Sequence, residues 1–434
     1  MAEIRAFRGI RYREDKAGDI AGLVAPPYDV VGEDERDRIV SCNPRNIFAL
    51  ELPKGGPCGL PEQERYTCAE RLFKDWLRQG VLALEDTPSV YPYEITFSHR
   101  GRRLTRTGFV ALVRIEHWEA KVILPHEKTF DKVTEDRLLL TRATRARFSQ
   151  VFALYRPNPR ARAVLSGVRK EVLATVEDSL GNVHVFSKAT DPEAIRELAE
   201  AISASPLYIA DGHHRYTTAL RYRDEMRARN GNPNAPYNYL MTYLVDAGDP
   251  GLVVLPTHRV VTFPEAPDPV GCAEKAAGAV ERDPVEPGRS PSETAHRVST
   301  LLAARPERRG VGLVWDGRAE IWWETGQGLS GISKVLSRLD VLFLNDVVLK
   351  GVFGITPEAN GQGAAIAYTP DAASAATNLA GNQILFILRG TPTEDVLDIA
   401  DAGLTMPHKS TFFAPKILTG FVLHSLDPEN RAME

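Results

Sequence analysis

Apolar and polar residues alternate or recur at helical spacing along the chain, and these patterns predict short strands mixed with helices. Val90 to Phe97 and Leu104 to Ile115 alternate, which predicts a β-hairpin. Tyr216 to Arg229 has apolar residues at helical spacing and stops before Gly231, which predicts a helix. The apolar run Leu207 to Ala210 just before it predicts a strand. The mixture indicates an α+β (mixed α/β) fold.

The other apolar segments continue this mixture. Further helices are expected at Glu33 to Val40, Cys68 to Gln79, Asp136 to Arg147, Cys272 to Arg282 and Val341 to Leu349. Further strands are expected at Ile47 to Leu50, Val151 to Tyr155, Tyr239 to Val245, Leu252 to Leu255, Gly310 to Trp315, Ala319 to Trp323 and Gln383 to Leu388.

A stretch rich in Pro, Gly, Ala and acidic residues, Pro264 to Ser292, marks the best internal boundary. A chain of 434 residues is too long for one simple core. We therefore expect one domain at residues 1–265 and a smaller C-terminal α/β domain at residues 266–434.

Composition excludes several classes of protein. The net charge of −4 gives no sign of general nucleic-acid affinity, and no apolar run is long enough to span a bilayer. The first five residues, Met1 to Arg5, lack the apolar core of a signal peptide. The four cysteines form no C-x-x-C pair, which argues against a zinc site and against a disulfide framework. We expect a cytoplasmic protein with reduced thiols.

The densest group of reactive side chains is Asp211-Gly212-His213-His214-Arg215, at the predicted junction of a strand and a helix. Free N–H groups and the helix dipole favour an anion at a helix start. An arginine in the same turn can bind a phosphate or carboxylate with two hydrogen bonds. Polar residues at such turns are often only structural, but four functional side chains in five positions favour a ligand or active site.

His126-Glu127 resembles the start of the zinc motif H-E-x-x-H, but Phe130 stands where the second histidine would be. The pair can still act as acid and base, or bind a divalent cation through Glu127. A plain polar loop is the alternative, and the sequence leaves both open.

A third cluster runs from Met406 to Thr411, with Lys416 five residues further on. Lys409 beside the hydroxyls of Ser410 and Thr411 can bind phosphate oxygens, although ordinary loop residues are the alternative. No Walker P-loop, Rossmann glycine motif or G-x-S-x-G elbow occurs.

These motifs resemble those of a widespread bacterial and archaeal family of unknown function. Six segments of this chain match motifs of that family. They are P-P-Y-D at Pro26 to Asp29, P-H-E-x-T at Pro125 to Thr129, E-D-R-L at Glu135 to Leu138, R-A-T-R at Arg142 to Arg145, D-G-H-H-R-Y at Asp211 to Tyr216, and M-P-x-K-S-T-x-F-x-P-K at Met406 to Lys416. The resemblance implies that substrate- or phosphate-binding residues include Tyr28, Asp29, Arg142, Arg145, Lys409, Ser410, Thr411 and Lys416. A solvated basic helix is the alternative for Arg142 and Arg145.

The D-G-H-H-R segment is also similar to the phosphate-binding turn of the ParB/sulfiredoxin superfamily, which includes partition CTPases, sulfiredoxin and kinases of free serine. This resemblance implies a ParB-like N-terminal domain in which Asp211 to Arg215 form the nucleotide or phosphate turn. The chain lacks the E-R-R motif of the partition proteins and the cysteine of sulfiredoxin.

The leading hypothesis is phosphoryl transfer to a small hydroxyl metabolite, possibly free serine, from a nucleotide or pyrophosphate. Arg215, Lys409 and the helix start would bind phosphate. Asp211 or Glu127 would hold Mg²⁺ or act as base, and His126, His213 or His214 would serve as acid or base. The C-terminal domain would bring Lys409 to the same cleft. The alternatives are a non-catalytic nucleotide-binding regulator of the ParB type and a metal-dependent hydrolase.

Overall fold

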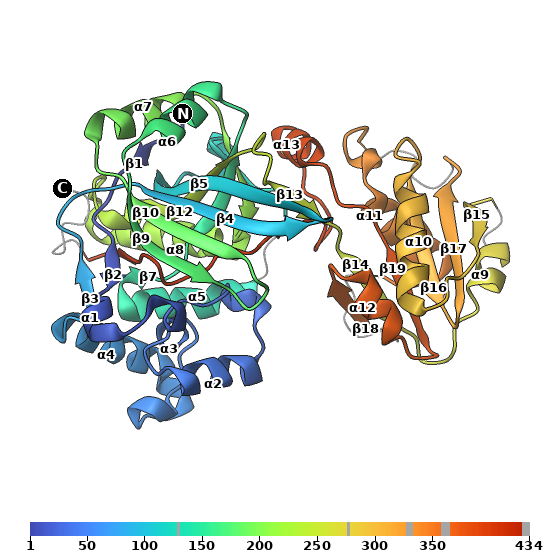
Figure 1. Cartoon of the computed structure of the whole chain (residues 1–434), viewed down its shortest axis with the longest axis horizontal. Coiled ribbons are helices and arrows are strands. Elements are labelled where there is room, and N and C mark those ends of the chain that lie inside the picture. The colour runs from blue at the N-terminus through green and yellow to red at the C-terminus, as the bar shows by residue number, and fades with distance from the viewer. Residues whose placement is uncertain (128–130, 276–277, 327–332, 357–364, 428–434) are drawn as a thin grey trace. The chain divides into compact units, whose positions relative to one another are not determined.

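The computed structural model describes residues 1–127, 131–275, 278–326, 333–356 and 365–427, and it has a mixed α+β fold (Figure 1). The chain forms two compact units. The first unit comprises Met1–Pro125, Thr129–Val253 and Pro415–Glu434, and the second comprises His126–Lys128 and Val254–Ala414. The main crossing therefore lies at Val253 rather than at residue 265, and the final segment belongs to the first unit. No helix in the described ranges is long and apolar enough to cross a membrane.

The first unit is built on a mixed sheet of nine strands in its described part, in the order β6-β11-β8-β12-β5-β4-β10-β9, with β1 beside β5. The pairs β6/β11 and β8/β12 are parallel, and the other pairs are antiparallel. The strands are β1 (Ile4–Arg5), β4 (Tyr91–His99), β5 (Arg102–Arg114), β6 (Ile123–Leu124), β8 (Val151–Tyr155), β9 (Glu171–Glu177), β10 (Val183–Lys188), β11 (Leu207–Asp211) and β12 (Tyr239–Asp246).

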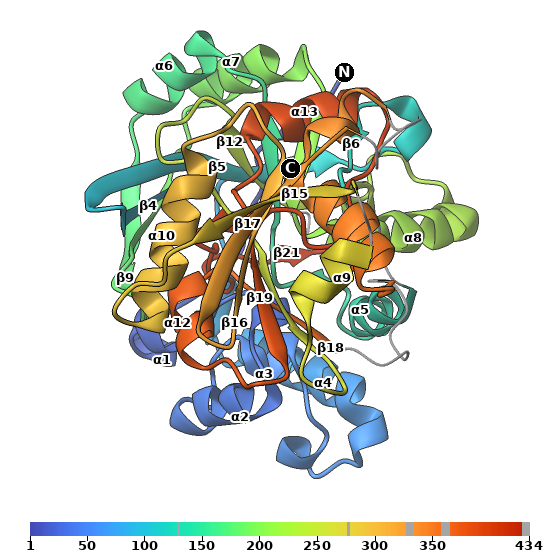
Figure 2. The ribbon, with the colours of Figure 1, turned by 90° about the vertical axis from the view of Figure 1, so that its right-hand side faces the viewer.

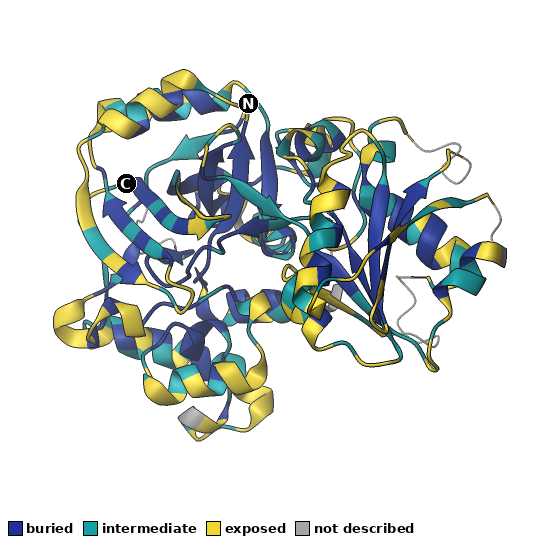
Figure 3. Ribbon diagram, turned by 45° about the vertical axis from the view of Figure 1, so that its right-hand side comes forward, coloured by how far each residue is buried: buried dark blue, intermediate teal, exposed yellow. Residues whose placement is uncertain are grey.

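Buried residues concentrate in the central strands β5, β8, β11 and β12 (Figure 3). The helices α6 (Pro159–Gly167), α7 (Pro192–Ser203) and α8 (His213–Asn230) contribute apolar side chains to one core cluster with β5, β8 and β11. Aromatic rings form a second cluster, in which Phe186 stacks on Phe421 with ring centroids 5.0 Å apart. The segment after Pro415 is thus part of the first unit's core.

The remaining helices of the first unit are α1 (Glu14–Ala17), α2 (Glu33–Cys42), α3 (Phe48–Glu51), α4 (Arg65–Arg78) and α5 (Asp131–Thr144). The predicted strand at Ile47 to Leu50 is wrong, because this stretch enters α3. The side chain of Asn46 accepts a hydrogen bond from the Phe48 N–H at 3.0 Å, which favours a helical turn.

Cys58 and Cys68 form a disulfide with their Cα atoms 5.6 Å apart, so the expectation of reduced thiols is wrong for this pair. Gly59, with a φ of 67°, reverses the chain between the 3-10 helix Gly56–Cys58 and α4. Cys58 and Cys68 are ten positions apart, so they do not form the C-x-x-C pair that the sequence analysis looked for.

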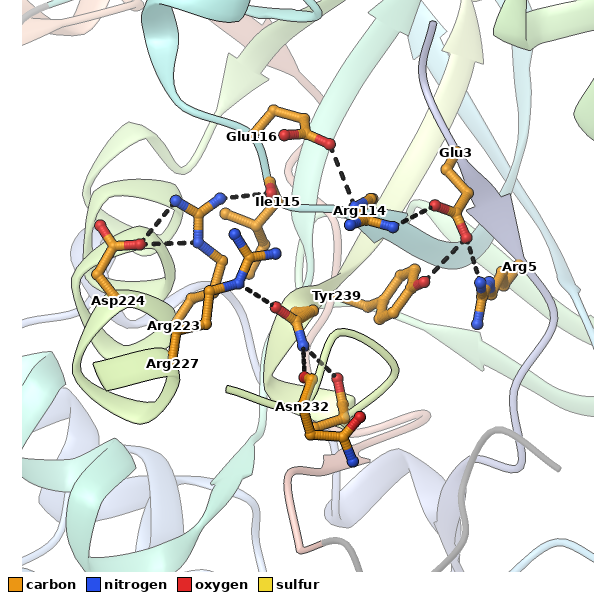
Figure 4. Close-up of polar contacts among 12 residues, drawn as sticks. Glu3, Arg5, Arg114, Ile115, Glu116, Arg223, Asp224, Arg227, Asn232 and Tyr239 are labelled. Carbon is orange, nitrogen blue, oxygen red and sulfur yellow. Dashed lines mark hydrogen bonds and ion pairs between the residues drawn. The ribbon is translucent and has the colours of Figure 1, made fainter. Parts of the chain in front are cut away.

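The middle and far end of α8 are fixed to the sheet by a network of polar contacts (Figure 4). Arg223 donates to the carbonyl of Ile115, just after β5, at 2.5 Å and pairs with Asp224 at 2.7 Å. Glu3, near the chain's start, pairs with Arg114 of β5 at 2.9 Å and accepts from the Tyr239 hydroxyl at 2.8 Å. The contacts of Arg223 thus join α8 to the end of β5, and those of Glu3 join the chain before β1 to β5 and β12.

The second unit has a six-stranded sheet in its described part, in the order β15-β17-β16-β19-β14-β18. Helices α10 (Pro291–Ala303) and α12 (Ala372–Thr377) pack together on one face, and the other face carries α9 (Pro269–Lys275) and the π-helix Phe343–Val352 (Figure 2). The strands are β14 (His258–Thr262), β15 (Val280–Val285), β16 (Gly310–Trp315), β17 (Arg318–Glu324), β18 (Ala365–Thr369) and β19 (Gln383–Ile387). Two further helices are α11 (Asp340–Leu342) and α13 (Thr393–Asp401).

The predicted helix at Cys272 to Arg282 is wrong in its second half. Residues from Val280 form β15, which pairs antiparallel with β17. The strand β13 (Val253–Leu255) does not form a hairpin with β12 but pairs with β20 (Phe412–Ala414). Two small sheets complete the structure: β2 (Ile10–Tyr12) with β3 (Leu82–Leu84), and β7 (Ala146–Arg147) with β21 (His424–Ser425).

Candidate functional site

Gly212 forms the turn between β11 and α8. Its φ of 89° is a conformation that residues with a Cβ rarely adopt. A Cβ atom at this position would also lie 2.8 Å from the Nε atom of Arg215. Gly212 therefore allows both the sharp turn and the close approach of a guanidinium to the first turn of α8, where backbone N–H groups have no partner within the helix.

Asp211, the last residue of β11, binds two cations. Its Oδ2 atom accepts from Arg215 Nη2 at 2.5 Å, and its Oδ1 atom accepts from the Nζ of Lys416. Burial alone would raise the pKa of Asp211, but Lys416 and Arg215 hold that pKa well below its usual value. The carboxylate therefore stays ionised near neutral pH. We call Asp211, Arg215 and Lys416 the Asp211 cluster.

Gln150 connects Arg215 to the segment that carries Lys416. Its backbone carbonyl accepts from Arg215, and its side chain donates to the carbonyl of Leu418 at 2.9 Å. Arg106 fixes the same segment by donating to the carbonyl of Pro415 at 2.9 Å. The backbone is therefore hydrogen-bonded both before Lys416, at Pro415, and after it, at Leu418.

Tyr28 and Asp29 lie in the 3-10 helix Tyr28–Val30, and both interact electrostatically with Arg215. Arg137 lies over the Tyr28 ring, 4.6 Å from its centroid. Burial raises the pKa of Tyr28 to about 12, so its hydroxyl stays protonated at neutral pH. The structure therefore brings the P-P-Y-D segment close to the Asp211 cluster.

Glu51 is a buried acid near this cluster that the sequence analysis did not identify. Its Oε1 atom accepts from the Ser149 hydroxyl at 2.8 Å and lies 4.0 Å from Arg137 Nη1. Its Oε2 atom has no hydrogen-bond partner among the described residues. Burial raises the pKa of Glu51. The one sequence signal for Glu51 is that an acid directly follows the apolar run Ile47 to Leu50.

The second unit joins two of the predicted motifs. Glu127 Oε1 accepts from the backbone N–H of Lys409 at 2.8 Å and lies 3.1 Å from Nδ1 of His408. The ring of His126 contacts Thr411 through Nε2 and Oγ1, 3.0 Å apart. Residues 282 positions apart in sequence thus form one cluster, which we call the Glu127 cluster.

Arg259 supports this cluster from β14. It donates to the carbonyl of Lys409 at 3.0 Å and lies over the Tyr368 ring, 5.4 Å from its centroid. Lys409 itself has a φ of 57°. The buried hydroxyl of Ser410 donates to the carbonyl of Pro407, three residues earlier, at 2.5 Å. This hydrogen bond closes the turn from Pro407 to Ser410.

Residues 4–342 match the family described as "Protein of unknown function (DUF1015)". The chain belongs to this family. No curated protein matches the sequence.

Three solved structures are similar to this chain at low sequence identity. A conserved hypothetical protein from Pyrococcus furiosus is 13% identical, with 71% of this chain and 94% of that chain covered and a TM-score of 0.34. A free serine kinase variant in complex with ADP is also 13% identical, with 71% and 87% covered and a TM-score of 0.35. A C-terminally truncated SbnI from Staphylococcus aureus is 10% identical, with 72% and 86% covered and a TM-score of 0.36.

The other predicted site residues of this DUF1015 chain lie in varied surroundings. His213 is buried at the first position of α8, where it helps to lower the pKa of Asp211, and His214 is half-buried beside it. Arg142 is exposed and pairs with Glu225 of α8 at 2.6 Å. No contact seen in the described residues joins Arg142 or Arg145 to the Asp211 cluster. Thr129 lies outside the described residues.

The donor sets do not fit a metal ion at Asp211. Both of its carboxylate oxygens are engaged by cationic side chains, which would repel a divalent cation. In the described part of the chain, no group of three or more His, Cys, Asp or Glu residues is arranged to hold a metal.

Proposed function

We propose that the chain is a phosphoryl-transfer enzyme that acts on a small hydroxyl metabolite, possibly free serine, with a nucleotide or pyrophosphate as donor. The observation that carries the proposal is the Asp211 cluster. Two largely buried cations, Arg215 and Lys416, flank one carboxylate at the start of α8.

The charges of this cluster favour a phosphate. One carboxylate and two cations leave one positive charge, and the positive end of the α8 dipole adds to it. Catalysis of phosphoryl transfer is mainly positioning and charge stabilisation, so cations that are already oriented are what the reaction requires. Arg215 has the planar donors that match phosphate oxygens.

Asp211 holds these cations in place in our proposal and is not the base. A carboxylate whose pKa lies well below its usual value is a poor acceptor for a hydroxyl proton. The resemblance to the serine kinases of the ParB/sulfiredoxin superfamily implies an acidic base.

The experiment is a phosphate-transfer screen read by mass spectrometry. Serine, other small amino acids and sugars are each incubated with ATP, ADP, CTP or pyrophosphate. Arg215→Ala should lower turnover by about 100-fold or more. Arg196→Ala serves as the matched control, because Arg196 is an exposed arginine of α7 whose ion pairs, among the described residues, are with Glu193 and Glu200.

Two results would overturn the proposal. If no acceptor gains a phosphate while a nucleotide still binds, the chain is a regulator of the ParB type. If Arg215→Ala keeps full turnover, the Asp211 cluster is not the phosphate site.

A further inference from the structure

The second unit contains a cavity of about 840 Å³, large enough for a small-molecule ligand. Thr257 and Arg259 line it from the start of β14, and Arg309 and Glu324 line it from the region of the β16–β17 hairpin. Ser410 lines it as well. All of its described lining residues belong to the second unit.

The lining is positively charged. Among the described lining residues, six arginine or lysine side chains face four aspartate or glutamate side chains, an excess of two positive charges. Several of these charges are already paired. Arg389 binds Asp340 through two nitrogens at 2.6 and 2.7 Å, and Arg309 pairs with Glu324.

Arg259 is a buried cation of the lining that forms no ion pair with a described carboxylate. It is only 2% exposed. Its guanidinium donates instead to the carbonyls of Thr257 and Lys409. Burial lowers the pKa of Arg259 to about 10, which still leaves it charged at neutral pH.

Two buried oxygens of the lining also lack partners. Glu324 Oε1 and Thr257 Oγ1 have no hydrogen bond within the described residues, although the Glu324 side chain and Thr257 are each only 5% exposed. Buried polar atoms are nearly always paired in folded proteins. One cavity is therefore lined by an acceptor oxygen of Glu324, the hydroxyl of Thr257 and the cation of Arg259. Together they can bind a polar ligand.

We propose that this cavity binds a small anionic metabolite that carries hydroxyl or amino groups. Arg259 pairs with the anionic group, and Glu324 Oε1 and Thr257 Oγ1 bond to the hydroxyl or amino groups. The site is separate from the Asp211 cluster, and it does not depend on phosphoryl transfer there.

Calorimetric titration of the whole protein tests the proposal with three probes. Glycerol 3-phosphate and glycerate each combine an anion with hydroxyl groups, whereas glycerol has the hydroxyls alone. The titrations are repeated in a Lys416→Met background, so that binding at the Asp211 cluster does not contribute. We expect at least one of the two anions to bind saturably in this background and glycerol not to bind.

Three variants locate the binding. Thr257→Val keeps the shape of the side chain and removes only the hydroxyl, and Arg259→Gln removes the charge. Each should weaken binding by about tenfold, while Thr257→Val leaves the unfolding temperature unchanged or raised. Arg318→Ala, an exposed arginine on the same strand as Glu324, should bind as the unaltered protein does.

The proposal is overturned if neither anion binds in the Lys416→Met background or if glycerol binds equally well. It is also overturned if Thr257→Val binds with unchanged affinity. In that last case the oxygens are satisfied by water alone. Because Thr257→Val is isosteric, this result does not depend on whether Arg259→Gln folds.

Discussion

Lys416 and Arg215 bind opposite oxygens of one carboxylate, that of Asp211, although Lys416 is 205 positions away from it in the sequence. Each cation neutralises part of the charge that the other would otherwise leave on a buried acid. The two contacts therefore support each other, and their loss should not be additive.

Lys416→Met should lower the free energy of unfolding by about 3 kcal/mol, because it leaves a largely buried pair with one partner fewer. The double variant with Asp211→Asn should lose less than the sum of the two single variants, because Asp211→Asn already removes the charge that Lys416 pairs with. Urea unfolding of the two single variants and the double variant measures the coupling. Additive losses would show that Lys416 and Asp211 do not interact.

Asp211 should make the protein sensitive to acid. Its folded-state pKa is lowered, so its contribution to stability is fully present above the unfolded pKa of about 3.9 and is lost as the pH falls toward the folded-state pKa. The free energy of unfolding should fall more steeply below about pH 4 in the unaltered protein than in Asp211→Asn. Parallel slopes for the two proteins would contradict the ion pairs.

Gly212→Ala should destabilise the fold by at least about 2 kcal/mol, since it combines an unfavourable φ with a clash against Arg215. It should also abolish phosphate binding at the start of α8. Gly231→Ala at the other end of the same helix is the control. Gly231 also has a positive φ, but its nearest contact would be 3.8 Å away, so only the backbone cost of about 1 kcal/mol applies. Thermal unfolding and calorimetry with inorganic phosphate measure both effects.

Glu51→Gln should stabilise the protein at neutral pH. The pKa of Glu51 is raised in the folded state, so ionisation above that pKa works against folding, and stability falls as the pH rises through it. The variant removes this penalty, and Arg137 keeps Asp136 at 2.5 Å as a partner. The gain should vanish below about pH 4, where the acid is protonated in both states. A loss of stability at pH 7 would show that ionised Glu51 supports the fold.

The sequence predicted the local features of the site but not its long-range partners. The strand at Leu207, the glycine turn and the helix beginning near Tyr216 follow from spacing and turn chemistry, and the structure has them. Lys409 and Lys416 were expected to act as one segment, yet they belong to different units. Only the tertiary fold decides where the chain crosses between the units after Ala414.

Other differences come from patterns that do not distinguish helix from strand. Ile47 to Leu50 is apolar at every position because all four residues are buried, so it shows neither period. Glu51 was not predicted because nothing in the sequence shows that the acid at the end of this run is buried. The disulfide between Cys58 and Cys68 depends on a chain reversal that spacing alone does not reveal.

Completion of the Asp211 cluster by a late segment has a consequence for synthesis of the chain. When Asp211 has been incorporated, Lys416 has not yet been made, and the 205 positions between them take about 10–40 s at about 5–20 residues per second. During this interval the nascent first unit lacks both Lys416 and the core segment around Phe421. The Asp211 cluster is thus completed only after translation of the second unit, and a chain that is terminated before Lys416 cannot form it.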